Sequence, residues 1–143
     1  MTSADHERCT RFPGRRGRDN HHMNIWVVDD DPGNVAMTLA TLALVPGVVA
    51  RGFPSGGSAL EALRTQPPPT VVLMDFYMGS ERGDAVTRQL RARCPGVRVV
   101  GYSSARSGSE AIVAAGGCDI VRKRRSADGL NHDLLAWLSA DAR

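Results

Sequence analysis

Short hydrophobic runs alternate along this chain with longer stretches in which hydrophobic residues recur every three or four positions. Short continuous runs suit β-strands, whereas the longer periodic stretches suit helices with one buried face. The strands are predicted at residues 25–28, 48–53, 71–74, 97–102 and 118–122. The helices are predicted at residues 34–45, 55–64, 83–93, 107–115 and 126–140. Strand and helix therefore alternate regularly between residues 25 and 140.

The predicted strands are continuous apolar runs rather than runs of alternating polarity. Such runs are typical of a parallel sheet that is covered by helices on both faces. Regular alternation of strand and helix then gives a doubly wound α/β domain with right-handed crossovers. Ser107 or Ser109 is expected to cap the fourth helix, and Leu130 is expected on the apolar stripe of the last helix.

The length of 143 residues suits one domain, and a hydrophobic share of 42% is sufficient for a packed core. No apolar run approaches the ~20 residues of a membrane span, and the start of the chain has no signal-peptide pattern. The three cysteines form no CxxC pair and are odd in number, which argues against a disulfide framework or a zinc site. These features favour a cytoplasmic protein without a membrane partner.

Basic residues gather in residues 1–22, where five arginines stand against three acidic groups and give a net charge of +2. Residues 23–143 have 13 basic and 12 acidic groups, and a nearly neutral body argues against binding of nucleic acid by this part. Residues 1–22 lack apolar periodicity, so we predict a disordered basic extension followed by one domain at residues 23–143. Two alternatives for the extension are that Met23 is the natural start, or that it is a basic arm for nucleic acid or anionic lipid.

Polar and charged residues follow the ends of four predicted strands. They are Asp29, Asp30 and Asp31 after the first strand, Asp75 after the third, Ser103 after the fourth and Lys123 after the fifth. Ligands of doubly wound sheets bind at the carboxyl ends of the strands, so these side chains are expected to converge. Lys123 is the only lysine among the 18 basic residues, and the other 17 are arginines. A general preference of this sequence for arginine explains why lysine is rare, but it does not explain why the one lysine lies at a strand end.

Carboxylates that converge in this way require a cation or a raised pKa. Two unit charges ~5 Å apart at an effective dielectric of ~20 repel by roughly 3 kcal/mol. Oxygen-only ligands suit a hard cation that retains water, which favours Mg²⁺ over zinc. A carboxylate can also accept a phosphoryl group as an aspartyl-phosphate, while a metal ion, a lysine and a hydroxyl neutralise the phosphoryl oxygens. The alternative is that residues 29–31 only cap the following helix, whose dipole favours negative charge.

Several segments resemble the receiver domain of bacterial two-component response regulators, and the resemblance extends over residues 23–141. "IWVVDDD" resembles the first strand of the family with its acidic pair, and "VVLMDFYM" resembles the strand that ends in the phospho-acceptor. "VVGYSS" resembles the fourth strand with its terminal hydroxyl residue, and "GGCDIVRK" resembles the segment that ends in the family's lysine. Gly83, eight residues after Asp75, matches a glycine of the family. The resemblance implies the flavodoxin-like receiver fold with the sheet order 2-1-3-4-5.

The resemblance also implies roles for individual residues. Asp75 is the expected phospho-acceptor, and Ser103 and Lys123 are expected to bind phosphoryl oxygens. The expected Mg²⁺ ligands are Asp29, Asp30, Asp75 and the backbone carbonyl of Tyr77. Asp31 is expected to be a solvated acid or the cap of the first helix.

The chain differs from the family pattern at three positions near this site. Arg124 follows the lysine where a proline is common, and Gly79 stands where a proline often follows the methionine. Ile120 stands where many relatives have an aromatic residue that turns inward on phosphorylation. Tyr102, next to Ser103, is a candidate substitute for that ring.

The resemblance implies a stand-alone receiver that takes a phosphoryl group from a sensor histidine kinase or a phosphotransfer protein in a phosphorelay. Such a protein is a signalling switch and not an enzyme with an external substrate. It would change a surface made by the fourth helix, the fifth strand and the fifth helix for a downstream protein partner. Residues 32–50 carry no charged side chain, so the first helix is either deeply packed or forms an apolar docking patch, for example in a homodimer.

Two other functions are compatible with the residues. One is a degenerate receiver that acts as a phosphorylation-independent interaction scaffold, which the departures at residues 120 and 124 favour. The other is an aspartyl-phosphate hydrolase of the haloacid-dehalogenase type. That family requires a second aspartate two residues after the nucleophile, where this chain has Tyr77.

Overall fold

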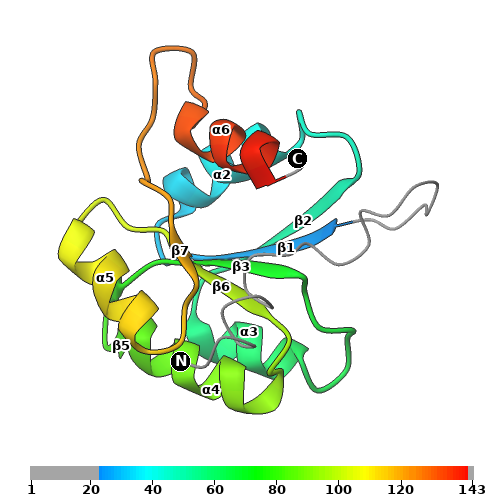
Figure 1. Ribbon diagram of the computed structural model, residues 1–143, viewed down its shortest axis with the longest axis vertical. Helices are drawn as coiled ribbons and strands as arrows, with labels where there is room; N and C mark the ends of the chain where they lie inside the picture. Colours follow the sequence, from blue (N-terminus) through cyan, green and yellow to red (C-terminus); the bar gives the residue numbers. More distant parts are fainter. Residues whose placement is uncertain (1–22, 142–143) are drawn as a thin grey trace.

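The apolar runs of the sequence pair side by side into a five-stranded parallel sheet between two layers of helices (Figure 1). The structure is a computed structural model that describes residues 23–141, and the predicted basic extension at residues 1–22 lies outside the described residues. The strands of the sheet are β1 (Met23–Val28), β2 (Val48–Phe53), β3 (Val71–Met74), β6 (Arg98–Gly101) and β7 (Asp119–Ile120). The helices are α2 (Pro32–Leu42), α3 (Gly56–Ala62), α4 (Gly83–Arg93), α5 (Arg106–Ala114) and α6 (His132–Asp141).

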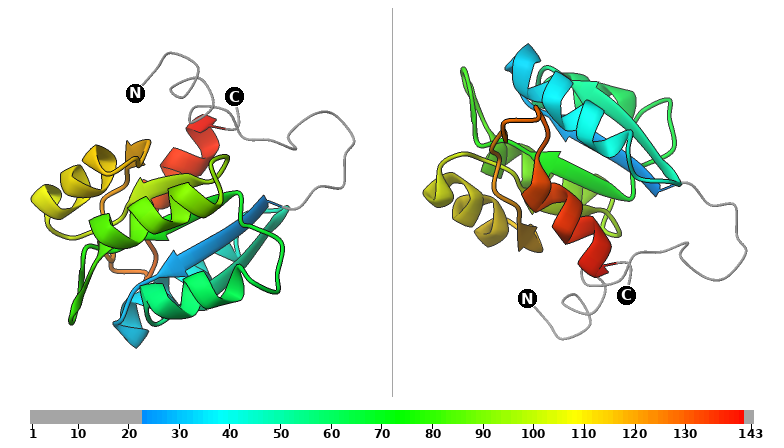
Figure 2. Two further views of the ribbon diagram at one scale, coloured as in Figure 1. Left: turned by 90° about the horizontal axis from the view of Figure 1, so that it is seen from below. Right: turned by 90° about the horizontal axis from the view of Figure 1, so that it is seen from above.

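The strand order is β2-β1-β3-β6-β7, and every neighbouring pair in this sheet is parallel. This order confirms the predicted doubly wound sheet. Helices α2 and α6 cover one face of the sheet, whereas α3, α4 and α5 cover the other (Figure 2). The central strands β3 and β6 are buried along their whole length because helices cover both of their faces.

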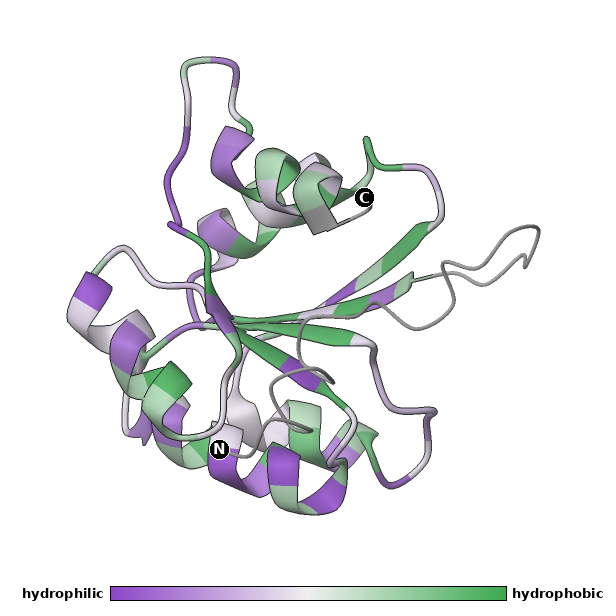
Figure 3. Cartoon of the chain, viewed as in Figure 1, coloured by the Kyte–Doolittle hydropathy of each residue, from purple (hydrophilic) through white to green (hydrophobic). Residues whose placement is uncertain are grey.

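Two apolar clusters hold the helical layers to the sheet. Successive strand residues point to opposite faces, so Val72 and Met74 of β3 join the cluster under α3, α4 and α5. Val71 and Leu73 join the cluster under α2 and α6. Figure 3 shows the hydrophobic strands in the interior and hydrophilic residues on the outer sides of α4 and α5. Among residues 23–141, no helix combines the length and the hydropathy that a bilayer span requires.

Helix α2 begins at an acidic cap and is only partly buried. The Asp31 carboxylate accepts a hydrogen bond from the Gly33 N–H at 2.9 Å, which confirms the capping alternative for Asp31. Its buried residues are Met37, Thr38, Thr41 and Leu42. Ala36 and Ala40 are exposed, so the uncharged sequence of this helix reflects a half-packed helix with a small-residue outer face.

The predicted start of the last helix is wrong by six residues. Ser126 donates its N–H to the Leu130 carbonyl at 2.9 Å, and Gly129 adopts a positive φ of 83°, so this segment forms a turn. Asn131 then caps α6 by accepting the Leu134 N–H at 3.2 Å. Leu130 precedes the helix and does not belong to its apolar stripe.

The predicted cap of the fourth helix is also wrong. Helix α5 follows Ala105, and among residues 23–141 no side chain caps its first turn. Ser109 lies inside the helix, where its hydroxyl accepts the Ser103 N–H at 3.2 Å. Ser109 therefore binds the backbone of Ser103 and does not cap a helix, and the sequence alone does not show this contact.

A hairpin that the sequence did not predict follows Asp75. Strands β4 (Tyr77–Met78) and β5 (Glu81–Arg82) pair antiparallel across a two-residue turn. Gly79 occupies this turn with a positive φ of 63°, which a glycine adopts without a steric cost. The glycine that stands in place of the family's proline therefore has a structural role of its own.

Candidate functional site

The carboxyl ends of β1 and β3 hold two buried carboxylates next to each other. The Asp29 N–H donates to the Phe53 carbonyl at 3.1 Å, and the Asp75 N–H donates to the Val28 carbonyl at 3.0 Å. Both residues therefore continue the backbone pairing of the sheet beyond the ends of their strands. Because the sheet holds their backbones, the positions from which their side chains project are fixed.

Lys123, beyond the end of β7, reaches across the sheet and lies between these carboxylates. Its Nζ is 2.7 Å from Asp29 Oδ2 and 3.1 Å from Asp75 Oδ1. The side chains of Lys123, Asp29 and Asp75 are only 7%, 1% and 8% exposed, respectively. In such a poorly solvated place, the attraction between ammonium and carboxylates is much stronger than at the surface.

Burial and the neighbouring charges both shift the pKa values of the ionisable groups in the site. Burial raises the pKa of Asp75, and the charge of Asp29 adds to this effect, while the Lys123 ammonium lowers it. Burial lowers the pKa of Lys123, but the hydrogen bond and charge of Asp29 outweigh this cost and raise the pKa above its ordinary value. Lys123 is therefore a protonated cation at neutral pH.

Backbone donors orient both carboxylates. Asp29 Oδ1 accepts the Asp31 N–H at 2.9 Å, and Asp75 Oδ1 accepts the Phe76 N–H at 2.9 Å. Each carboxylate thus has a second contact besides Lys123. The arrangement is preorganised because neither side chain has to rotate into place.

The acidic side chains of this edge fit a hard cation. Asp29, Asp30 and Asp75 each offer a carboxylate oxygen, and these atoms lie within 4.8 Å of one another. Three carboxylates outnumber the single Lys123 ammonium by two negative charges, and the exposed Asp30 leaves the site open to solvent. Oxygen donors, excess negative charge and access to water are the conditions that Mg²⁺ requires.

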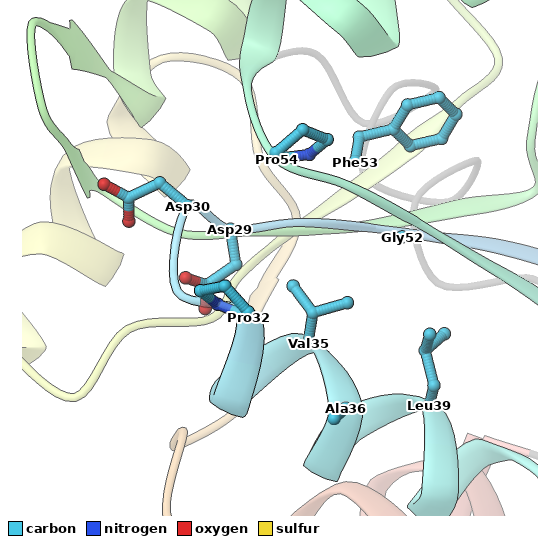
Figure 4. A pocket seen from close by; sticks show the side chains of 9 residues that line it. All are labelled: Asp29, Asp30, Pro32, Val35, Ala36, Leu39, Gly52, Phe53 and Pro54. Atoms are coloured by element: carbon cyan, nitrogen blue, oxygen red, sulfur yellow. The ribbon is translucent and has the colours of Figure 1, made fainter.

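Asp29 and Asp30 lie at one end of an apolar groove between α2 and β2 (Figure 4). The groove has a volume of about 320 Å³. Tyr77, whose carbonyl is the fourth predicted metal ligand, lies on β4 with an exposed side chain. Its role as a ligand stays a prediction.

Ser103 is buried at the end of β6, but its hydroxyl has another partner. Ser103 Oγ accepts the Ala105 N–H at 3.2 Å, within the loop before α5. Its backbone carbonyl accepts the Lys123 N–H at 3.4 Å, so the backbones of the two residues are adjacent. Ser103 is placed beside the site, and its role toward a phosphoryl group stays a prediction.

Two sets of contacts that support the site were not predicted from the sequence, those of Glu81 and those of Tyr102, which the sequence offered only as a substitute for the missing ring. Glu81 on β5 accepts the N–H groups of Gly56 and Gly57 at 2.8 and 2.9 Å, and so ties the hairpin after Asp75 to the first turn of α3. Tyr102 forms a buried hydrogen-bonded network with α2 and α6. The two-residue glycine turn was a signal for the hairpin, whereas the sequence contains no local signal for the partners of Glu81.

The sequence and the fold of this chain are similar to those of known proteins. The sequence model of a family described as the response regulator receiver domain matches residues 25–134. The chain belongs to this family. The receiver domain is 33% identical over 91 residues to the DNA-binding transcriptional regulator NtrC of Escherichia coli (strain K12), which covers 64% of this chain. The match covers only 19% of NtrC, so the chain spans about a fifth of that relative.

Solved structures show the same fold. A CheY-like receiver domain protein from Methanospirillum hungatei JF-1 has a TM-score of 0.70 at 18% identity, with 85% of this chain and 94% of that chain covered. A response regulator from Thermotoga maritima has a TM-score of 0.69 at 20% identity, with 85% and 98% covered. Receiver domains are phosphoryl-accepting signalling modules of two-component systems and not enzymes in the ordinary sense.

Proposed function

We propose that this receiver domain accepts a phosphoryl group on Asp75 from a phosphohistidine of a sensor histidine kinase or a phosphotransfer protein. The observation that carries the proposal is the Lys123 ammonium, which lies 3.1 Å from Asp75 Oδ1 in a buried site. A cation at this distance from the acceptor is suited to pair with an oxygen of the transferred group. A phosphoryl group is negatively charged, so it can attract the Lys123 ammonium in place of part of the attraction that Asp29 and Asp75 exert on it.

The reaction forms one bond and breaks one. A carboxylate oxygen of Asp75 attacks phosphorus, and the P–N bond of the donor breaks with its electron pair passing to the imidazole nitrogen. Asp75 must be ionised for this step, and the charge of Lys123 favours the ionised form. Lys123 and the Ser103 hydroxyl then bind the phosphoryl oxygens, and Ser103 Oγ can donate its proton while it accepts the Ala105 N–H.

The carboxylates of Asp29, Asp30 and Asp75 hold Mg²⁺ in this proposal, together with the Tyr77 carbonyl. When bound, the ion supplies neutralisation of charge on the phosphoryl oxygens. The excess of carboxylates over ammonium groups within ligand distance supports this assignment.

In this proposal, a binding partner recognises the phosphorylated state at the surface formed by α5, β7 and α6. We propose a downstream protein or a second copy of the chain as its partner, in the cytoplasm. Strand β7 is an edge strand of the sheet with α5 on one side and α6 on the other, so a shift at Lys123 reaches this surface directly (Figure 2).

A phosphorylation-independent scaffold is the second candidate. Ile120, half-buried on β7, cannot act as an aromatic switch. This observation favours a surface that is the same with and without a phosphoryl group.

The proposals are tested by incubating the protein with acetyl phosphate and Mg²⁺ and measuring phosphoryl uptake by intact mass. Wild type is expected to gain one phosphoryl group, and Asp75→Asn is expected to gain none. Asp84→Asn is the matched control, because Asp84 is also a buried aspartate but lies in the first turn of α4. It should be phosphorylated like wild type.

Each outcome separates the candidates. Uptake by Asp75→Asn would contradict the acceptor assignment. No uptake by wild type from acetyl phosphate or from a phosphorylated kinase would favour the scaffold. Uptake that persists in EDTA would contradict the metal assignment alone.

A further inference from the structure

A buried polar network lies behind the site, where α2, β6 and α6 meet. The Tyr102 hydroxyl is 2.8 Å from Thr38 Oγ1 of α2 and accepts a hydrogen bond from Asn131 Nδ2 at 2.9 Å. The Asn131 N–H donates to Thr41 Oγ1 at 3.0 Å. All four residues are fully buried, although the surrounding cluster is apolar. Such a network is stable only when its members satisfy one another, and it then has little freedom to move.

The side chain of Asn131 uses all of its hydrogen-bonding groups. Nδ2 donates to the Tyr102 hydroxyl and, at 3.0 Å, to the Arg122 carbonyl. Oδ1 accepts the Leu134 N–H at 3.2 Å. An asparagine amide has two N–H donors and one acceptor oxygen, so each of these groups has a partner. The amide therefore has one orientation, which its partners determine.

The Arg122 carbonyl belongs to the same peptide group as the Lys123 N–H. That N–H donates to the Ser103 carbonyl at 3.4 Å, which is a long bond, whereas the Asn131 bond to the carbonyl is 3.0 Å. Because a peptide group is planar, contacts at both ends fix the orientation of its plane. The plane sets the direction in which the Lys123 side chain leaves the backbone.

These contacts close a ring around the base of Lys123. From Asn131 the ring passes through the peptide group of Lys123 to the Ser103 carbonyl, then through the backbone to Tyr102, whose hydroxyl returns it to Asn131. Burial raises the pKa of Tyr102, so its hydroxyl stays protonated and able to serve the network. Strand β7 ends at Ile120, and backbone pairing continues beyond it through the Val121 N–H, which donates to the Gly101 carbonyl at 2.9 Å, and the long bond of the Lys123 N–H. The Asn131 contact therefore adds a second hold on the peptide group of Lys123.

We infer that Tyr102 and Asn131 are positioning residues that hold the Lys123 ammonium against Asp29 and Asp75. The consequence for phosphoryl transfer rests on the proposed function, whereas the consequence for the resting position of Lys123 does not. A displacement of a charged group by about 1 Å can slow a reaction by up to about a hundredfold. The network thus extends the site to the interface of α2 and α6.

Lys123 is the only lysine in the chain, so isotope-labelled lysine gives one side-chain signal in an NMR spectrum. We would record this signal at neutral pH in EDTA, without a phosphodonor, and measure in parallel the rate of phosphorylation by acetyl phosphate with Mg²⁺. The first measurement reports the surroundings of the ammonium directly. A residue that served only the stability of the fold would leave this signal in place.

Three variants remove successive links of the network. Asn131→Ser keeps a capping oxygen for α6 but removes both amide donors. Tyr102→Phe removes the hydroxyl, and Thr38→Val removes the outermost partner. Leu138→Val is the matched control, because Leu138 packs in the same apolar cluster and on the same helix without a link to the network.

The effects should decrease with distance from the Arg122 carbonyl. Asn131→Ser should shift or broaden the Lys123 signal most and slow phosphorylation about tenfold or more, followed by Tyr102→Phe and then Thr38→Val. Leu138→Val should leave the signal in place. If Asn131→Ser does not fold, the other two variants decide the question.

An unchanged Lys123 signal in the folded network variants would overturn the inference. An equal shift in Leu138→Val would also overturn it, since loose packing of α6 would then be sufficient. If wild type accepts no phosphoryl group, the proposed function fails, and the Lys123 signal alone still decides the inference.

Discussion

Lys123 lies between two carboxylates that would otherwise repel each other inside the protein. Its ammonium is 2.7 Å from Asp29 and 3.1 Å from Asp75, with almost no exposure to solvent. An ammonium is a compact charge on a flexible stem, whereas a guanidinium is a wide planar group with a fixed fork. The role of this residue therefore depends on its shape as well as its charge.

We predict that Lys123→Arg leaves the fold and Mg²⁺ binding near normal but lowers the phosphorylation response at least about tenfold. The free energy of unfolding should fall by less than about 2 kcal/mol, because the positive charge remains. Urea unfolding, Mg²⁺ titration and phosphoryl uptake measure the three properties. Lys123→Met is the comparison, and should lose about 3–5 kcal/mol without metal because it leaves two buried carboxylates without their cation. An unaffected phosphorylation response in Lys123→Arg would contradict the proposed site.

The raised pKa of the buried Asp75 carboxyl indicates that its ionised form lowers the stability of the fold. Burial raises the folded-state pKa above the ordinary value of 3.8, so the folded state binds a proton more tightly than the unfolded chain. The ionised carboxylate therefore lowers stability at neutral pH, and this loss is relieved as the pH falls through the raised pKa.

In the absence of metal, we predict that Asp75→Asn raises the free energy of unfolding at pH 7 by roughly 1 kcal/mol, because the neutral amide has no buried charge. The difference from wild type should shrink as the pH is lowered. Denaturant unfolding in EDTA over a pH series measures it. Asp84→Asn should instead lose about 0.5–1 kcal/mol, because Asp84 pairs with Arg82 at 3.1 Å in the first turn of α4. Lower stability of Asp75→Asn at pH 7 would refute the argument.

At the scale of the elements, the start of α4 is packed against the acceptor strand without room for a side chain. A Cβ atom at Gly83 would overlap the Asp75 carbonyl oxygen and lie 2.9 Å from the Asp75 carbonyl carbon. These are backbone atoms of the residue that carries the acceptor, so they cannot yield without moving it.

We predict that Gly83→Ala lowers the free energy of unfolding by about 3 kcal/mol or more and disturbs phosphoryl uptake, because α4 has to move away from β3. Thermal unfolding and uptake from acetyl phosphate measure both effects. Gly96→Ala is the matched control, since a Cβ atom there meets nothing within 4 Å. It should change stability by less than about 0.5 kcal/mol. Equal stabilities of the two variants would contradict the packing argument.

At the scale of the whole molecule, a tryptophan reports on the surface that the proposed switch changes. Trp137 of α6 donates its Nε1–H to Asp119 Oδ2 of β7 at 2.7 Å, and the Arg98 guanidinium lies 5.4 Å from its ring centroid. The second tryptophan, Trp26, is buried on β1 in the cluster of the opposite layer.

We predict that Mg²⁺ and beryllofluoride change the fluorescence of Trp137, because the contact between β7 and α6 shifts when Lys123 turns to a phosphoryl-like group. Trp137→Phe should abolish the change, whereas Trp26→Phe should retain it if the variant folds. Steady-state emission measures this directly. A wild-type protein that binds beryllofluoride without any change along α5, β7 and α6 would favour the scaffold.

Much of this architecture could be predicted because it depends on short-range patterns. Residues 71–74 and 83–93 were predicted with the bounds that the structure has, because a continuous apolar run and a clear helical period leave few alternatives. The end of β7 and the start of α6 were predicted poorly. Residues 126–131 contain Asp128, Gly129 and Asn131, which favour a turn, but the predicted helix ran through this local signal. The contacts of Asn131 with Thr41 and Tyr102 depend on the tertiary structure.

The sequence by itself determined the parallel sheet, its order by resemblance, and the meeting of Asp29, Asp30, Asp75 and Lys123 at one edge. Strand ends follow from local hydrophobicity, and parallel pairing brings them together. Only the tertiary structure decided that Lys123 bridges two carboxylates, that the Ser103 hydroxyl has another partner, and that Tyr102 and Asn131 lie behind the site. These are contacts between residues far apart in the chain, and side-chain hydrogen bonds of this kind depend on distances of a few tenths of an ångström that no sequence pattern records.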